Sequence, residues 1–484
     1  MKLPPLLVAL TTLTTGLATS LSAQNVHPEG LCTARTGPVP ISGDFDCLRV
    51  PVFEDRERGA GREISLHVVV LPSTGDDPAP DPLFFLPGGP GQASAELAGY
   101  VRMLHAAILA ERDIVLVDFR GTGDSNGLDF EVTPEDVLAS VSDPLPLDIV
   151  KRELARLEER ADLTKYTTEA IVDDLDDVRE FLGYEKINLW GGSYGTRVAL
   201  AYLRQHPEHA RAAVIKGVAP MGFAIGADFA VDTQRSIEGT FAHCAADPNC
   251  ASAYGDVSEL LDTFLANLDE EPVHVTTRHP LSGQNVDVPL TRNVVLLTIR
   301  DMLYSTPEHG QLPRMIAAGA SGHLEEWAQK ALTGAGQSWG QLYEGMFLSV
   351  AAAEDLPLLQ RLDLEADGEG TLLGGRFTAP MREALEAWPQ GTVDPGFWEP
   401  VVSDVPVLLV SGVLDPVTPA AKGAEAARHL ANSLHLVFET GSHDDSMFRP
   451  CIDRIYADFL RAGTVEGLDV DCAMRERPIR FAID

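Results

Sequence analysis

Positive charge is scarce in this chain, where 37 lysine and arginine residues face 72 aspartate and glutamate residues and the formal net charge is −35. Proteins that bind nucleic acids or anionic membrane surfaces need basic patches. Such patches release counterions from nucleic-acid phosphates or attract acidic lipid headgroups. The sequence therefore predicts no nucleic-acid partner and no binding to an anionic membrane. The excess of acidic residues favours solubility instead.

Long apolar runs are also missing, except near the N-terminus. After Lys2 an apolar, threonine-rich stretch ends in the small residues 21–23, which is the pattern of a secretory signal peptide. We expect residues 1–23 to be a signal peptide cleaved before Gln24, and the protein to be exported to a periplasm or to the extracellular space. A retained membrane anchor is the alternative, but the run is short and contains prolines. After cleavage we expect no membrane contact.

Only six cysteines are present, and none has the C-x-x-C or clustered cysteine and histidine spacing of a zinc site. An even number of cysteines in an exported chain favours disulfides, although sequence alone does not determine how they connect. Pairing by proximity predicts Cys32 with Cys47, Cys244 with Cys250 and Cys451 with Cys472. We predict no metal site and no cofactor.

The chain does contain short apolar runs, each bounded by Gly, Pro or Asp and followed by a helix-like segment. Such runs suit strands that are buried on both faces of a parallel sheet. Their alternation with helices predicts an α/β fold with a mostly parallel central sheet flanked by helices. The stretch 64–72 is expected to belong to an antiparallel N-terminal edge. The other runs cover residues 82–89, 113–121, 187–192, 212–220, 405–412 and 434–443.

These strand-like runs stop near Pro220 and resume near Val405. The intervening stretch has mostly helical patterns and is too long for an unstructured loop in a compact domain. We therefore expect a core interrupted by an inserted helical cap. The predicted boundaries are 24–220 for the first part of the core, 221–395 for the cap and 396–484 for the second part of the core.

Ser193 lies between a β-like run and a helix-like run, within the glycine-rich segment 191–195. This segment matches G-x-S-x-G, in which the serine occupies a strained turn from strand to helix and the glycines avoid a steric clash. The short pattern alone is weak, because a small residue at a tight turn has the same sequence. The preceding strand and the following helix, ended by Pro207, favour a nucleophile.

A serine hydroxyl needs a histidine to take its proton and a carboxylate to orient that histidine. When the serine lies on this kind of turn, the acid and then the histidine follow it along the chain. Asp415 comes just after the run 405–412, and His443 ends the run 434–443. Loops at the same edge of a parallel sheet can bring them together. The alternatives are a turn-capping aspartate and a surface histidine.

Acyl transfer also needs N–H donors for the oxyanion that develops at the substrate carbonyl. One predicted donor is the backbone of Tyr194, directly after the serine. The other is Gly89, in the glycine-rich turn LPGGPGQAS that follows an early strand. An ordinary Gly-Pro turn is the alternative for that segment. The presence of a nucleophile, an acid and a base elsewhere favours the catalytic interpretation.

Together the segments PGGPG, VDFRGTGDS, GGSYGT and DPVTP and the late histidine resemble the proline iminopeptidase and tripeptidyl aminopeptidase group of α/β-hydrolase serine peptidases. The resemblance is strongest to secreted members with a C-terminal segment of the tripeptidyl type. It covers the core on both sides of the cap and implies an α/β-hydrolase fold with Ser193, Asp415 and His443 as a triad. The chain departs from the family at Pro87, where a histidine is frequent, and at 351–353, where alanines replace a cysteine.

An aminopeptidase must recognise a free ammonium group, and a carboxylate near the nucleophile can supply this recognition. Glu354 and Asp355 resemble the acidic pair of the family and are candidate binding residues, with an acidic helix end as the alternative. The predicted function is an exported serine exopeptidase that removes proline or short peptides from peptide N-termini. A carboxylesterase or amidase acting on small non-peptide substrates uses the same triad, and a non-catalytic binding protein is a remote alternative.

Two further charged segments are expected to have structural roles. Asp118 and Arg120 follow a strand, and we expect them to form an ion pair below the site. In the segment 173–177, DDLDD, helical spacing of the apolar residues predicts aspartates on a solvated face. The helix that contains this segment is expected to have Thr168 as its N-cap and to stop at Gly183.

Overall fold

The computed structural model describes residue 41 and residues 43–269, 272–363, 368–444, 450–475 and 477–483. The predicted signal peptide and Cys32 lie outside these residues. None of the helices in the described ranges is both long and apolar enough to cross a membrane.

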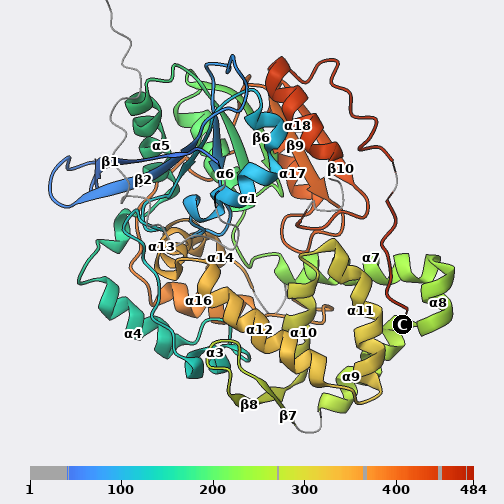
Figure 1. The fold of residues 1–484 in the computed structure, drawn as a ribbon. Helices are drawn as coiled ribbons and strands as arrows, with labels where there is room; N and C mark the ends of the chain where they lie inside the picture. Colours follow the sequence, from blue (N-terminus) through green and yellow to red (C-terminus); the bar gives the residue numbers. More distant parts are fainter. Residues whose placement is uncertain are drawn as a thin grey trace, which may run out of the picture.

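A twisted sheet lies in the upper half of the molecule as seen in Figure 1, and within the described residues it has eight strands in the order β1-β2-β4-β3-β5-β6-β9-β10. The strands from β4 to β10 are mutually parallel, while β2 is antiparallel to both β1 and β4. The predicted parallel runs and the predicted antiparallel edge are therefore confirmed. The strands are β1 (Asp46–Phe53), β2 (Glu63–Leu71), β3 (Leu83–Leu86), β4 (Ile114–Val117), β5 (Ile187–Gly192), β6 (Ala210–Lys216), β9 (Val407–Gly412) and β10 (Ser433–Phe438).

Helices cover both faces of this sheet, as expected for buried parallel strands. Helices α1, α2 and α18 pack on one face, and α5, α6 and α17 pack on the other. Apolar side chains alternate between the two cores along the central strands: Leu189 of β5 joins one core and Trp190 the other. The bounds are α1 (Ala98–Leu104), α2 (Ala106–Leu109), α5 (Thr168–Leu182), α6 (Tyr194–Gln205), α17 (Ala420–Ala427) and α18 (Cys451–Ala462).

Between β6 and β9 the chain leaves the sheet and forms a mostly helical cap, below the sheet in Figure 1. The cap also contains an antiparallel hairpin of β7 (Val273–Arg278) and β8 (Asn285–Leu290), which the sequence did not predict. The cap helices are α7 (Phe229–Ala246), α8 (Pro248–Tyr254), α9 (Val257–Asp269), α10 (Arg292–Met302), α11 (Thr306–Ala320), α12 (Glu325–Gln341), α13 (Glu344–Glu354), α14 (Leu356–Leu359) and α16 (Thr378–Glu386).

Two helices that precede β5 in the sequence also lie in the cap layer, α3 (Pro134–Ser140) and α4 (Leu147–Leu157). The His279 ring nitrogen Nε2 lies 2.9 Å from the carbonyl oxygen of Pro134. The backbone N–H of Phe130 donates to Glu344 in α13 over 3.0 Å. One apolar core continues from the sheet into the cap, so the cap is packed against the rest of the molecule along much of its length.

Two of the predicted disulfides are confirmed, Cys244–Cys250 in the cap and Cys451–Cys472 after the last strand. The third predicted pair includes Cys32, which is not among the described residues. After Cys472 the C-terminal segment runs from the core to the cap, where the backbone N–H of Ala482 donates to Gly310 over 2.9 Å. Figure 1 shows this end of the chain beside α8 and α11.

The prediction of an Asp118–Arg120 pair was wrong, because each side chain has a different buried partner. Asp118 lies 3.0 Å from the His67 ring and accepts the backbone N–H of Ala95 over 2.8 Å. Arg120 is fully buried and binds both carboxylate oxygens of Asp174 over 2.7 Å. Both residues are structural, as expected, but they connect different parts of the core.

The predicted solvated face of α5 was also wrong at Asp174, which is buried. Asp174 follows Ile171 by three positions, and residues three apart share one face of a helix. It therefore points inward with the apolar residues. The N-cap of α5 is Thr167 rather than Thr168, since the Thr167 hydroxyl accepts the N–H of Ala170. Gly183 ends the helix in the left-handed conformation, as predicted.

Replacing Arg120 by methionine is expected to lower the free energy of unfolding by about 3 kcal/mol, because it removes one cation from the buried carboxylate of Asp174. Urea unfolding monitored by circular dichroism measures the change. Arg49→Met is the matched control, since Arg49 pairs with the partly exposed Asp124 and such surface pairs contribute under about 1 kcal/mol. Equal losses in the two variants would contradict the structural role of Arg120.

Candidate active site

Ser193 occupies a sharp turn directly between β5 and α6. Its φ is 54° and its ψ is −121°, a conformation that costs free energy for any residue with a side chain. The flanking glycines make the turn possible. A Cβ atom on Gly195 would lie 2.1 Å from the carbonyl oxygen of Leu86, and one on Gly191 would lie 2.4 Å from that of Gly195. The turn has the geometry that presents a nucleophile.

The glycine-rich turn after β3 borders this serine because β3 and β5 are adjacent and parallel. After β3 the chain adds β4 on one side of that strand and then β5 on the other side. Ligands of open α/β sheets bind where the strand order changes direction in this way. A Cβ atom on Gly88 would lie 3.3 Å from that of Ser193. Gly89 follows with a φ of 108°, and Tyr194 is the first residue of α6. Tyr194 therefore follows Ser193 directly, and the turn that contains Gly89 lies beside the serine through Gly88.

Asp415 and His443 meet at the carboxyl ends of β9 and β10. The His443 Nδ1 atom lies 2.8 Å from Oδ2 of Asp415. The other carboxylate oxygen accepts the backbone N–H groups of Val417 and Thr418 over 2.8 and 2.9 Å. Burial alone raises the pKa of Asp415, but the charge of His443 and these hydrogen bonds outweigh it and hold the pKa well below its usual range. Asp415 is therefore ionised.

Thr418 is a neighbour of this pair that sequence reasoning did not single out. Its hydroxyl lies 2.8 Å from Asp415 Oδ2 and 3.1 Å from His443 Nδ1. The Asp-x-x-Thr spacing in DPVT is a signal for it, because an aspartate at the start of a turn accepts hydrogen bonds from the residues two and three positions later.

The end of β6 joins the serine to the histidine. The backbone N–H of Ser193 donates to the carbonyl oxygen of Lys216 over 2.9 Å, and the Lys216 ammonium donates to the carbonyl oxygen of His443. A Cβ atom on Gly217 would lie 3.3 Å from His443 Cε1. One short segment at the end of β6 thus contacts both residues.

A model of the alpha/beta hydrolase fold family matches residues 81–450, which is more than half of the chain. The chain belongs to the α/β-hydrolase family. Together with the elbow at Ser193, this membership makes it a serine hydrolase. The predicted fold class is confirmed, and so is the prediction of a serine hydrolase enzyme over the remote alternative of a non-catalytic binding protein.

Three relatives of this α/β hydrolase are peptidases by name. Serine protease Hip1 of Mycobacterium tuberculosis is 25% identical over 91% of this chain and 90% of its own length. Tripeptidyl aminopeptidase of Streptomyces lividans is 31% identical over 37% of this chain and 36% of its own length. Proline iminopeptidase of Neisseria meningitidis is 31% identical over 28% of this chain and 32% of its own length.

Glu354 and Asp355 lie at the end of α13 and have no exposed surface. One Arg197 nitrogen, Nη1, donates to both, over 3.1 Å to Glu354 and 2.9 Å to Asp355. Glu354 also accepts the backbone N–H and the hydroxyl of Thr168 over 2.6 and 2.8 Å. Oδ2 of Asp355 has no hydrogen-bond partner among the described residues. The pair therefore forms a buried cluster with Arg197, one turn of α6 beyond Ser193.

Two carboxylates share one guanidinium in this cluster of the hydrolase, so their charges are not fully balanced. Burial raises the pKa of Glu354 to about 7, although Arg197 and the hydrogen bonds from Thr168 oppose the shift. Burial also raises the pKa of Asp355. With both groups ionised the cluster carries one excess negative charge, which a further cation could neutralise.

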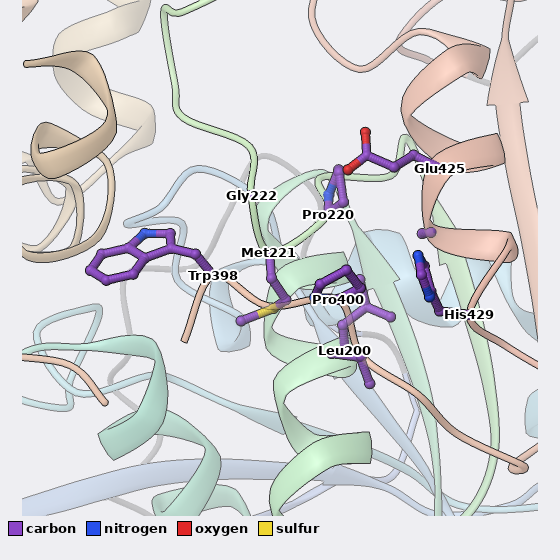
Figure 2. Close-up of a pocket in the computed structure, with 10 residues that line it drawn as sticks. Leu200, Pro220, Met221, Gly222, Trp398, Pro400, Glu425 and His429 are labelled. Atoms are coloured by element: carbon purple, nitrogen blue, oxygen red, sulfur yellow. The ribbon is translucent and has the colours of Figure 1, made fainter. Parts of the chain in front are cut away.

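A small pocket opens beside α6 of the hydrolase (Figure 2). It contains neither Ser193 nor the acid and base. Its volume of about 30 Å³ is room for water and not for an acyl group. The pocket is lined by residues of α6, of the segment after β6, of the segment before β9 and of α17, namely Leu200, Pro220, Met221, Gly222, Trp398, Pro400, Val401, Glu425, Ala426 and His429.

Asp176, His206 and His209 come within metal-ligand distance of one another on the surface of this hydrolase. The oxygens of Asp176 already have other partners, since Arg179 donates to both over 2.6 and 3.0 Å. The Tyr202 hydroxyl donates to one of them over 2.7 Å. A cation here would displace these donors, so the group is a hydrogen-bond network in this structure.

Replacing Glu354 by glutamine should change how stability depends on pH. The pKa of Glu354 is raised on folding, so the folded state binds its proton more tightly and Glu354 makes the free energy of unfolding fall as pH rises from about 5 to about 7. Glutamine lacks this proton. The variant should therefore gain stability relative to the wild type as pH rises over that range.

Urea unfolding at pH 5, 6, 7 and 8 measures this difference. Glu158→Gln, the same chemical change at an exposed site, is the control and should show a nearly constant difference. If the Glu354→Gln difference is also constant, the pKa of Glu354 is not raised.

Proposed function

We propose that this α/β hydrolase is an exported serine exopeptidase that removes proline or short peptides from the N-termini of peptides. Three observations support the proposal. Ser193 lies on a strained elbow, Asp415 contacts His443 over 2.8 Å, and a buried pair of carboxyl groups that shares one guanidinium lies one turn of α6 away. The names of the relatives, a serine protease and a tripeptidyl aminopeptidase, agree with peptide substrates.

In the proposed reaction Ser193 Oγ attacks the scissile carbonyl carbon and its proton passes to Nε2 of His443. The backbone N–H groups of Gly89 and Tyr194 stabilise the oxyanion. His443 then gives the proton to the leaving amine, which departs as the C–N bond breaks. Water attacks the resulting ester with His443 again as the base, and His443 returns that proton to Ser193 Oγ as the C–O bond to the serine breaks and the acid is released. Asp415 stays ionised and orients His443 throughout.

The acidic cluster is the observation that carries the exopeptidase assignment. A free N-terminus is an ammonium ion, and a charge-assisted contact in a desolvated site discriminates strongly against an acylated N-terminus. Glu354 accepts hydrogen bonds from Thr168 and Arg197, whereas Oδ2 of Asp355 has no hydrogen-bond partner within the described part of the chain. Within the predicted pair, Asp355 is therefore the better anchor for the substrate amine.

The esterase alternative draws support from the same cluster. Both carboxylates are buried, and Arg197 neutralises part of their charge, so a substrate amine would have to enter a site that is closed in this structure. A small ester or amide without an amine needs only the serine, the acid, the base and the oxyanion donors. Neither alternative needs a metal or an organic cofactor for its chemistry.

Export is part of the proposal and is supported by the two disulfides, which persist in oxidising compartments. The acidic composition is consistent with a protein that binds neither nucleic acid nor a membrane surface after cleavage. Mass spectrometry of the N-terminus of the protein from culture fluid or periplasm would locate the cleavage site, which we expect before Gln24.

Matched chromogenic substrates test the proposed function. We expect mature protein to cleave prolyl or tripeptidyl arylamides with free N-termini, and acetylation of these substrates to lower kcat/KM at least about 100-fold, because it removes the ammonium charge. Ser193→Ala should abolish turnover. Hydrolysis of a short aryl ester alone, still dependent on Ser193, would replace the exopeptidase assignment by the esterase.

Replacing Asp355 by asparagine should remove the discrimination between free and acetylated N-termini. We expect kcat/KM for the free arylamide to fall by about 10- to 100-fold and that for the aryl ester to change much less, since only the former substrate is a cation. Glu354→Gln is the matched comparison and should have the smaller effect. If both variants still prefer free over acetylated N-termini, the acidic cluster does not recognise the substrate amine.

A further inference from the structure

The loop that carries His443 is held by the cap as well as by the core. The connection between α10 and α11, together with the first residue of α11, supplies three of its contacts. The backbone N–H of Asp444 donates to the carbonyl oxygen of Tyr304 over 3.0 Å. On the other side of the histidine, the Ser442 N–H donates to the Thr306 hydroxyl over 3.2 Å, and its hydroxyl donates to Leu303. The backbone on both sides of His443 is therefore tied to one short segment of the cap.

The same segment places an aromatic ring against the histidine itself. The ring centroids of Tyr304 and His443 are 5.1 Å apart, at an interplanar angle of 72°. This is the edge-to-face arrangement that aromatic pairs prefer. Asp415 and Thr418 both contact the imidazole at Nδ1, and contacts at one nitrogen still allow the ring to tilt about that atom. The Tyr304 ring blocks the tilt of the imidazole toward its own side.

The position of Tyr304 is itself fixed by Arg300. The Arg300 guanidinium donates to the Tyr304 hydroxyl over 2.9 Å. It lies 4.5 Å from the ring of Phe229 and 4.3 Å from that of Phe377, and Arg300 is 6% exposed. Phe229 begins α7 and Phe377 precedes α16. Residues from three parts of the cap thus meet around one cation that holds the tyrosine.

We propose that Tyr304 is a positioning residue for His443. A general base must keep Nε2 directed at the nucleophile while Nδ1 stays on its carboxylate, and small displacements of reacting groups cost large factors in rate. The Tyr304 ring restricts the imidazole to that orientation, and the Arg300 cation holds the ring. The inference rests on the serine-hydrolase assignment and not on the choice between peptide and ester substrates.

A fluorophosphonate probe tests the inference independently of the substrate. Ser193 must attack phosphorus with His443 as its base, with loss of fluoride, so the limiting rate of inactivation at saturating probe reports how well the base is placed. Tyr304→Leu removes the ring, and we expect this rate to fall about 10- to 100-fold with little change in the half-saturating probe concentration. Tyr304→Phe loses the hydroxyl but keeps the ring and its contact with the Arg300 guanidinium, 5.2 Å from the ring centroid, and should react within about 3-fold of the wild type.

Phe264→Leu is the control, because Phe264 belongs to another buried ring pair of the cap, 5.2 Å from Trp327. It should lower Tm and leave the limiting rate unchanged. If Tyr304→Leu does not fold, Tyr304→Met fills more of the ring volume and takes its place. A folded variant without the ring that inactivates as fast as the wild type overturns the proposal. The proposal is also overturned if Tyr304→Phe or Phe264→Leu lowers the limiting rate of inactivation as much as Tyr304→Leu does.

Discussion

The strained backbone of Ser193 is the constraint on which the arrangement of this site depends. A positive φ at a serine persists only when its surroundings impose it, and here the close approach of α6 to β3 does so. Gly195 lies against the carbonyl oxygen of Leu86 at a separation that leaves no room for a side chain. The same contact brings the turn containing Gly88 beside the serine. Nucleophile and predicted oxyanion turn are therefore parts of one packing arrangement.

The cap contributes to the site in two ways. On one side, α13 places Glu354 and Asp355 against Arg197, one turn of α6 beyond the nucleophile. On the other side, the connection between α10 and α11 contacts the backbone around His443 and places Tyr304 on its ring. Movement of the cap as a whole would disturb both contacts. In this hydrolase the cap is thus better described as a fixed part of the site than as a separate lid.

The errors of the sequence-based predictions have a common physical origin. Asp118 and Arg120 are close in the chain and opposite in charge, which suggested a mutual pair, but their partners His67 and Asp174 come from other elements. The hairpin of β7 and β8 was missed because its two short alternating runs lie between segments with helical patterns. Thr418 was missed because a threonine hydroxyl in a turn can have many different hydrogen-bond partners. Each case depends on contacts between segments far apart in sequence.

The sequence by itself determined the alternation of strands and helices, the elbow at Ser193 and the order in which Asp415 and His443 follow it. Local periodicity and turn residues encode these features, since they depend on neighbours along the chain. Only the tertiary structure decided that Arg197 shares the acidic pair Glu354 and Asp355, and that Tyr304 contacts the base. Those contacts arise where α6 and the catalytic loops pack against the cap, and no local pattern specifies which side chains meet across that boundary.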